Sequence, residues 1–244
     1  DRWYCSVPSD TWPNRRFALS ATSYGDIYDT PKVEFSWPTI FDSMTTAGVT
    51  WKNYSGGPPL TALLWPHLAI EAPFHFGSIT DFENHCAAGT LPTFSFIEPH
   101  YGSSGNSMHP PYPVSPGDLL IAQIYNAVRG NKAQWEQTLL LVTFDEHGGT
   151  ADHAPPPATA VAPDDHTQDG FDFTRFGVRV PMLMISPYIP AGTVYRPDAS
   201  TCDHTSILGT LEFLFGLAPL TNRDKAAPVL NGLLGSTLRT DCLA

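Results

Sequence analysis

The stretch TLLLVTFDEHGG, residues 138–149, decides the fold class. Its first seven residues form a continuous apolar run, which is typical of a strand covered on both faces of a sheet. Val180–Ser186 is a second run of this kind. Shorter strands are expected at Val49–Tyr54 and Thr93–Ile97, and a helix is expected at Pro116–Arg129, between Thr93–Ile97 and the run at 138–144. Strands that alternate with helices predict an α/β fold, a three-layer sandwich with a mostly parallel central sheet and helices on both faces.

Further helices are expected on either side of these strands. Their predicted ranges are residues 11–22, 37–47 and 203–217. In the first of them, Thr11 is placed as the N-cap and Pro13 falls in the first turn, where proline is tolerated.

Composition limits the classes of protein to which this chain can belong. Of its 244 residues, 42% are hydrophobic and only 15% are charged, which indicates a globular protein. The sequence contains no repeat and no low-complexity linker, so we expect a single domain over residues 1–244. Its net charge of −11 excludes a nucleic-acid partner, and any anionic substrate must be attracted locally by a metal or a few arginines. Nor does any apolar run approach the roughly 20 residues that span a bilayer.

Four cysteines form an even set whose spacings match no zinc motif: Cys5, Cys86, Cys202 and Cys242. Either they are buried thiols or they form two disulfides, and scarce lysine with plentiful proline favours disulfides in a secreted or periplasmic protein. Three pairings exist, of which Cys5–Cys86 with Cys202–Cys242 is one.

The strongest local signal is the acidic turn after the buried strand, Asp145-Glu146-His147-Gly148-Gly149. Neighbouring strand side chains point to opposite faces, so both acids can share one ion only where the strand has ended. Two carboxylates about 4 Å apart repel by roughly 4 kcal/mol at an effective dielectric of about 20. A hard divalent cation would remove that repulsion. The alternative is a solvated acidic turn without a ligand.

A second signal is the run Asp10-Thr11-Trp12-Pro13-Asn14-Arg15-Arg16. On structural grounds it is a helix N-terminus and no more. On functional grounds, a hydroxyl at a helix N-terminus lies in a positive field that stabilises its alkoxide and an incoming phosphate. In that case Asn14 donates to a phosphoryl oxygen and Arg15 balances charge.

Histidines form a third group, with five of the nine in the loops expected at strand ends. These are His100, His109, His147, His153 and His204. A single histidine is more often structural, but several beside paired acids predict at least one that is catalytic.

Several segments together resemble the phosphoesterase family of bacterial phospholipases C and related acid phosphatases, which has an alkaline-phosphatase-like fold. They follow in order along most of the chain: SVPSDTWPNRRFALSATSYG (6–25), FIEPHYG (96–102), HPPYPVSPGDLLIAQIYNAV (109–128), LLLVTFDEHGGTADHAPPP (139–157), FGVRVPMLMISPYI (176–189) and DHTSILGTLEFLFGLAPLTNRD (203–224).

The resemblance implies a role for each matching polar residue. Thr11, in the T-x-P-N pattern, is the implied nucleophile, and it shares one divalent metal ion with Asp145 and Glu146. His109 faces the phosphoryl group. The remaining implied residues are Asn14 and His204 in catalysis, Asn14, Arg15 and His153 in substrate binding, and Glu98 with no assigned role.

The chain departs from the family at one point. Family members carry a Glu-Asn pair on a first strand upstream of the nucleophile, where it completes the metal site. Only ten residues precede Thr11 here, and Glu83-Asn84 repeats the letters by coincidence. We therefore expect a domain that lacks its N-terminal first strand, and a separate N-terminal segment that would complete the site.

The sequence thus predicts a metal-dependent phosphoesterase of the phospholipase C or acid phosphatase type, acting through a phosphothreonine intermediate. Phosphate esters or phospholipids are the expected substrates, and the aromatic residues allow a peripheral contact with a membrane. A catalytically impaired phosphate- or lipid-binding remnant of the fold is the alternative. A sulfatase is excluded, because TWPNR lacks the Cys or Ser with Pro-x-Arg of that class.

Overall fold

A computed structural model describes residues 2–30, 37–71, 73–197 and 200–241. Its helices are α1 (Thr11–Ser20), α2 (Ile40–Thr46), α3 (Leu60–Leu64), α4 (Pro66–Glu71), the 3₁₀ helix η1 (Pro73–His75), α5 (Ile79–Ala88), α6 (Ser115–Arg129), α7 (Lys132–Trp135), α8 (Thr205–Phe215) and α9 (Asn222–Lys225). Its strands are β1 (Trp51–Ser55), β2 (Phe76–Ser78), β3 (Phe94–Glu98), β4 (Leu140–Thr143) and β5 (Met182–Ile185). None of these helices is both long and apolar enough to cross a membrane.

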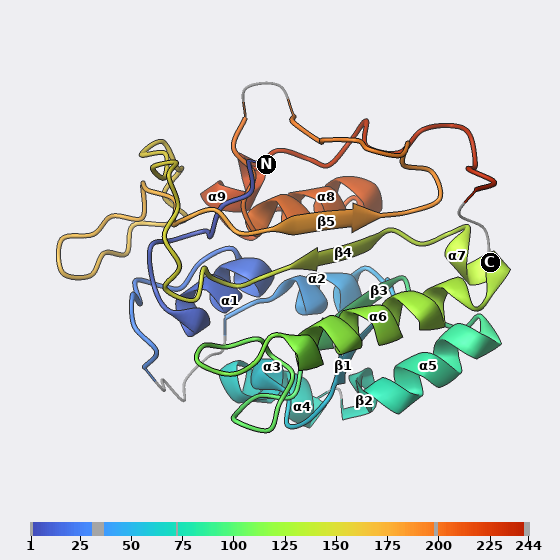
Figure 1. The fold of residues 1–244 in the computed structure, drawn as a ribbon. Helices are drawn as coiled ribbons and strands as arrows, with labels where there is room; N and C mark the ends of the chain where they lie inside the picture. The colour runs from blue at the N-terminus through green and yellow to red at the C-terminus, as the bar shows by residue number, and fades with distance from the viewer. Residues whose placement is uncertain (1, 31–36, 72, 198–199, 242–244) are drawn as a thin grey trace.

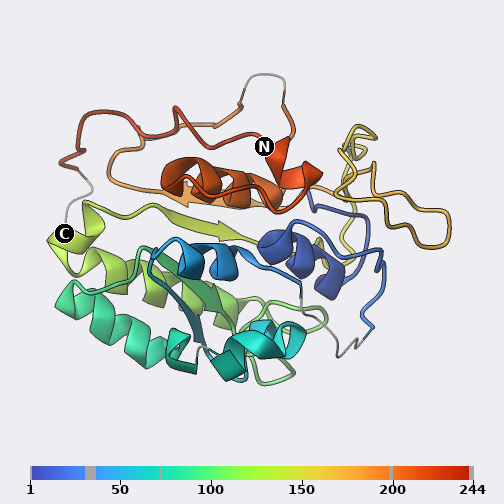
Figure 2. The same ribbon diagram turned by 180° about the vertical axis from the view of Figure 1, so that it is seen from behind.

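The strands form a middle layer between two layers of helices. Figure 1 looks onto α5 and α6, which lie in front of the parallel strands, while β4 and β5 are open to view above them. Figure 2, the view from behind, looks onto α1, α2 and α8 on the opposite face. The predicted three-layer α/β architecture is therefore confirmed, whereas the single domain over residues 1–244 stays a prediction.

The described strands belong to two sheets, in which one prediction holds and another fails. The strands β2, β1 and β3 are parallel in the order β2-β1-β3, as expected of an α/β fold. In contrast, β5 pairs antiparallel with β4. On β5 the side chain of Leu183 is 51% exposed, so the expectation of a strand covered on both faces was wrong there.

Each face of the parallel sheet has its own hydrophobic core. On one face, Trp51 packs with buried residues of α1, α2 and α8, including Phe41 and Leu208. Toward the other face, Tyr54 packs with Phe82 and with apolar residues of α6 and α7. Since strand side chains alternate, positions 51 and 54 of β1 serve opposite faces.

Helix α1 begins one residue earlier than the capping prediction required. Asp10, in an extended conformation, is the N-cap, so Thr11 is the first helical residue. The helix ends where Ala21 adopts a left-handed conformation with φ of 59°. Thr11 nevertheless lies in the positive field of the helix N-terminus, because that field extends over the first turn.

The cysteines are buried thiols wherever the structure describes them. Cys5 and Cys86 lie in separate hydrophobic clusters without a disulfide, so the pairing of these two was wrong. Cys202 is likewise a free thiol, and Cys242 lies outside the described residues. Burial, with the charges of Glu146 and Asp145, raises the pKa of Cys5 to about 12, so this thiol stays protonated. Export from the cell stays a prediction.

Two acids are buried together where α8 meets α9. Glu212 is 5% exposed and Asp224 is 1% exposed. Asp224 accepts hydrogen bonds from the backbone N–H groups of Leu220 and Thr221. Burial, together with the hydrogen bond and the charge of Asp224, raises the pKa of Glu212 to about 9. Glu212 is therefore protonated at neutral pH.

We expect Glu212→Gln to flatten the dependence of stability on pH. Between 4.5, the ordinary pKa of a glutamate side chain, and the folded value of about 9, the parent takes up a proton on folding. Its free energy of unfolding therefore falls as pH rises, by at most about 1.4 kcal/mol per pH unit. Glutamine cannot ionise, so the variant lacks this loss. Urea unfolding of both proteins across this window measures it, and parallel curves would contradict the assignment.

Candidate active site

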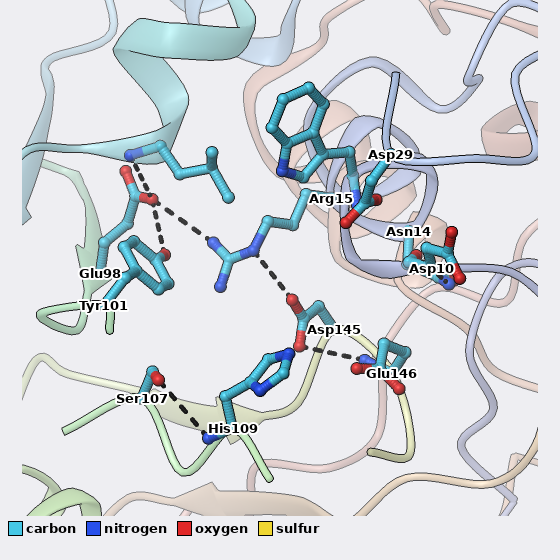
Figure 3. Close-up of polar contacts among 12 residues, drawn as sticks. Asp10, Asn14, Arg15, Asp29, Glu98, Tyr101, Ser107, His109, Asp145 and Glu146 are labelled. Atoms are coloured by element: carbon cyan, nitrogen blue, oxygen red, sulfur yellow. Dashed lines mark hydrogen bonds and ion pairs between the residues drawn. The ribbon is translucent and has the colours of Figure 1, made fainter. Parts of the chain in front are cut away.

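The carboxyl ends of β1, β3 and β4 bring polar side chains to one end of the fold. Asn53 pairs in register with Phe96, two residues before Glu98, so Asn53 and Glu98 share one face of the sheet. The Asn53 amide donates to Glu98 Oε1 at 2.7 Å. Asp145 lies two residues after the end of β4 and is linked to Glu98 through Arg15 (Figure 3). Polar groups thus gather beyond the strand ends, where ligands bind in open α/β sheets.

Glu98 is the most enclosed acid of this group, with an exposure of 0%. Five groups donate to its two carboxylate oxygens: Asn53 Nδ2 (2.7 Å), Tyr101 Oη (2.9 Å), Leu60 N (3.1 Å), Thr61 N (3.2 Å) and Arg15 Nη1 (3.4 Å). The two backbone donors belong to the first turn of α3. A carboxylate with this many donors is fixed in place, because leaving a buried charge unpaired is costly.

Arg15 lies between the two acids. Its Nε donates to Asp145 Oδ2 at 2.9 Å, while its Nη1 is 3.4 Å from Glu98 Oε2. The guanidinium also lies over the Tyr101 ring, 5.1 Å from the ring centre. Burial opposes the charge of Arg15, but Asp145, Tyr101 and Glu98 outweigh it and raise the pKa of the guanidinium. Arg15 is therefore a permanent positive charge at the site.

Thr11 lies one turn before Arg15 on the same face of α1, since residues i and i+4 are neighbours about 5–6 Å apart at their Cβ atoms. The backbone around Thr11 does not offer the free N–H groups that an anion-binding helix N-terminus usually has. The next backbone N–H, of Trp12, donates to Asp29 Oδ1 at 2.7 Å, and Pro13 has no N–H. The helix N-terminus thus has few free donors, and a phosphate at Thr11 depends on Arg15 for positive charge.

The acidic turn has the shape that its glycines predicted. Gly148 and Gly149 have φ values of +62° and +77°, which glycine adopts at little cost. Asp145 Oδ1 accepts from the backbone N–H of Glu146 at 3.1 Å, and Glu146 Oε2 accepts from that of Gly148 at 2.6 Å. Their side chains are 25% and 15% exposed, so both carboxylates remain accessible to a small ligand.

The carboxylate oxygens of Asp145 and Glu146 are chemically suited to bind a divalent cation. Carboxylate and hydroxyl oxygens are donors that hard cations prefer, and the guanidinium on Asp145 shows that this carboxylate already attracts a positive group. Over the described ranges, however, no group of three or more His, Cys, Asp or Glu is arranged to hold a metal. Among the described residues, Asp145 and Glu146 are thus the two acids that remain as candidate ligands of the cation.

His204, at the N-terminus of α8, is hydrogen-bonded to the main chain of the acidic turn. It is 1% exposed, and its Nε2 donates to the backbone carbonyl of Asp145 at 2.7 Å. Burial lowers the pKa of His204, so its ring is a neutral donor. This geometry positions Asp145, and a buried ring with this bond is poorly placed to protonate a leaving group.

His109 and His153 differ in their relation to the site. His109 is exposed and points toward Asp145 in Figure 3, and its Nδ1 donates to the Pro110 carbonyl at 2.6 Å. Its Nε2 is therefore the nitrogen that faces a ligand. The side chain of His153 is 92% exposed and lies 3.5 Å from Asp152 in a surface loop. The structure gives His153 no contact with the residues gathered around Arg15.

Asn14 has a different role from the predicted phosphate donor. It is fully buried, and its Nδ2 donates toward the carbonyl oxygens of Val7, Ser9 and Asp10. Its Oδ1 accepts from the Val7 backbone N–H at 3.2 Å. With its amide hydrogens directed at three carbonyl groups, Asn14 fixes the loop before Thr11, and the structure does not support direct donation to phosphate.

Sequence reasoning missed three contributors to the site: Asn53, Tyr101 and Asp29. Asn53 follows from the rule that strand ends carry ligands, since it lies near the end of a predicted strand. Tyr101 and Asp29 come from loops, whose side-chain directions no periodicity predicts. Glu83, which the sequence analysis set aside, lies on α5 and accepts from Gln123 of α6 at 2.8 Å.

The chain is similar in sequence to phospholipases C. The Phosphoesterase family model matches residues 1–218. Non-specific phospholipase C6 of Arabidopsis thaliana is 36% identical over 99% of this chain and 50% of its own length. Non-specific phospholipase C3 of the same plant is 38% identical over the same shares. Phospholipase C B of Mycobacterium tuberculosis (strain ATCC 25618 / H37Rv) is 31% identical over 91% of this chain and 49% of its own. The chain thus spans about half the length of the curated relatives it matches.

One solved structure supports the fold. A protein in the alkaline phosphatase superfamily from Vibrio parahaemolyticus superposes with a TM-score of 0.55 at 15% identity, over 98% of this chain and 64% of that one. This likeness confirms the α/β architecture predicted from the sequence and, at such low identity, extends to the fold alone.

Proposed function

This chain belongs to the Phosphoesterase family, and from that membership we propose that it hydrolyses phosphate esters by transferring the phosphoryl group to Thr11. The observation that carries the proposal is the geometry of α1. The helix begins at Thr11 and, one turn later, directs Arg15 onto Asp145 at 2.9 Å. Thr11 thus lies one helical turn from a permanent cation that is bound to the acidic turn.

Each residue then has a defined chemical task. The Thr11 hydroxyl gives its proton to solvent and attacks phosphorus, and the bond from phosphorus to the leaving alcohol breaks. Doubly protonated His109 gives its Nε2 proton to the leaving oxygen, because its Nδ1–H is held by Pro110. Water then hydrolyses the phosphothreonine, which releases phosphate or a phosphorylated headgroup and restores Thr11.

We propose one divalent cation as the cofactor, held by Asp145 and Glu146 together with the Thr11 hydroxyl. Such an ion, when bound, would neutralise charge on the phosphoryl group and acidify the hydroxyl. The chain's own contribution is to hold the two carboxylates at the turn. Gly148 N fixes Glu146, and His204 fixes the main chain of Asp145.

The substrate class follows from the relatives' names. Those relatives are called phospholipases C, so we propose a phospholipid or a soluble phosphate ester as the substrate. Hydrolysis of p-nitrophenyl phosphate and p-nitrophenyl phosphorylcholine, with Mg²⁺ or Mn²⁺ and again with EDTA, tests the proposal. We expect turnover of at least one ester with metal and its loss with EDTA. No turnover of either ester with either metal would contradict the enzymatic function.

A binding protein without turnover is the second candidate. It is favoured by one observation, that no group of three or more His, Cys, Asp or Glu residues is arranged to hold a metal in the described ranges. That protein would bind inorganic phosphate in a calorimeter, depend on Arg15 for it, and hydrolyse neither ester.

A further inference from the structure

Arg15 is bound by two carboxylates whose surroundings are unequal. Glu98 is fully buried and has four other donors, two of them backbone N–H groups of α3. The Asp145 side chain is 25% exposed, and among the described residues its other donor is the backbone N–H of Glu146. One end of the guanidinium therefore faces a fixed carboxylate, and the other faces a carboxylate that solvent can reach.

The guanidinium of Arg15 lies closer to Asp145 than to Glu98. Its Nε is 2.9 Å from Asp145, whereas its Nη1 is 3.4 Å from Glu98. The Tyr101 ring lies against the guanidinium, and the Tyr101 hydroxyl donates to Glu98 at 2.9 Å. If the bond to Asp145 breaks, Glu98 and Tyr101 remain as an anchor that keeps Arg15 at the site.

We propose that Arg15 is an exchangeable counter-ion of Asp145, anchored by Glu98 and Tyr101. Without a divalent cation it neutralises Asp145. When a cation takes Asp145, the guanidinium stays on its anchor, and its released Nε–H binds the phosphoryl group of the substrate. The exchange rests on the proposed function and gives Glu98, for which the sequence predicted no role, the task of positioning Arg15.

The exchange follows from charge. A guanidinium and a divalent cation repel each other, so both cannot occupy the same carboxylate oxygen. Contacts of partly exposed charges are weak, and those of buried charges are costly to break. Asp145 is thus the partner that Arg15 gives up. Trp12 N is occupied by Asp29, so the freed Nε–H supplies a donor that the helix N-terminus lacks.

Metal affinity, measured without substrate, tests the exchange. Titration calorimetry with MnCl₂ should show Arg15→Gln binding Mn²⁺ about tenfold more tightly than the parent, a change of about 1.4 kcal/mol. Arg15→Lys, which keeps the charge but cannot reach both acids in the same way, should show a smaller gain. The matched control is Arg175→Gln, which removes the same charge from an exposed position.

Affinity for Mn²⁺ that is unchanged or weaker in both Arg15 variants would overturn the exchange. An equal gain in Arg175→Gln would overturn it as well, because the effect would then be one of net charge. Far-ultraviolet circular dichroism checks that each variant is folded, and Arg15→Lys decides the matter if Arg15→Gln does not fold.

Inorganic phosphate provides a second readout. In the parent, saturating Mn²⁺ should tighten phosphate binding, and in Arg15→Gln this coupling should shrink about tenfold. Equal coupling in both proteins would contradict the released donor. Turnover of p-nitrophenyl phosphate by the parent separates the two proposals. An active parent with unchanged Mn²⁺ affinity in the variants refutes only the exchange, and an inactive parent with the predicted affinities refutes only the enzymatic function.

Discussion

Replacing Thr11 by alanine is expected to lower turnover of p-nitrophenyl phosphate by at least about 10³-fold, because the covalent step loses its nucleophile. The fold should persist, since Thr11 is a partly exposed residue in the first turn of α1, and Asp10 rather than Thr11 is the N-cap. Steady-state kinetics at saturating Mn²⁺ measure the loss, and the thermal unfolding midpoint checks the fold.

Two variants make this result specific. Thr11→Ser keeps a hydroxyl and should retain part of the activity. Ser115→Ala removes an exposed hydroxyl from the first residue of another helix, α6, and should leave turnover unchanged. If Thr11→Ala stayed near parental activity with the same metal content, another group would have to be the nucleophile.

The second large effect concerns the acidic turn. Asp145→Asn and Glu146→Gln should each weaken Mn²⁺ affinity by more than about 100-fold, since loss of a ligand's outer-shell partner alone costs 10–100-fold. Activity should fall in parallel and recover in part with excess Mn²⁺. Elemental analysis after gel filtration, with calorimetry, measures the occupancy of the site.

Glu83→Gln is the matched control for these variants. It removes one carboxylate charge, but Glu83 lies on α5 and bonds to Gln123, apart from the strand-end residues. Its Mn²⁺ affinity should equal that of the parent. Parental occupancy in both Asp145→Asn and Glu146→Gln would mean that the acidic turn is structural.

Much of the frame could be predicted from the sequence, because backbone rules govern it. The apolar run ending at Phe144 predicted the strand β4, whose residues are half-buried, and Gly148-Gly149 marked the turn after it. Since parallel strands end at the same edge, Glu98 and Asp145 were expected at one end of the sheet. Strand direction was harder to predict, as an apolar run has no polarity, and β5 is antiparallel to β4.

The roles of single polar residues could not be predicted in the same way. Asn14 lies in the expected helix and His204 at the start of another, but both are buried and directed at backbone carbonyls that no sequence pattern marks. His153, on an exposed loop, points to Asp152 instead of the site. Glu98 and Asp145 are linked through Arg15, which is 83 residues from Glu98 and 130 residues from Asp145 in the sequence. Only the fold brings these three residues together.

Trapping the phosphoryl enzyme tests the central claim most directly. The protein is mixed with Mn²⁺ and excess p-nitrophenyl phosphate, quenched in acid within the first turnovers, digested and analysed by tandem mass spectrometry. The account predicts one phosphoryl group on Thr11, in the peptide containing TWPNR, and none in Thr11→Ala. Turnover without a phosphorylated peptide, or a phosphoryl group on another residue, would contradict it.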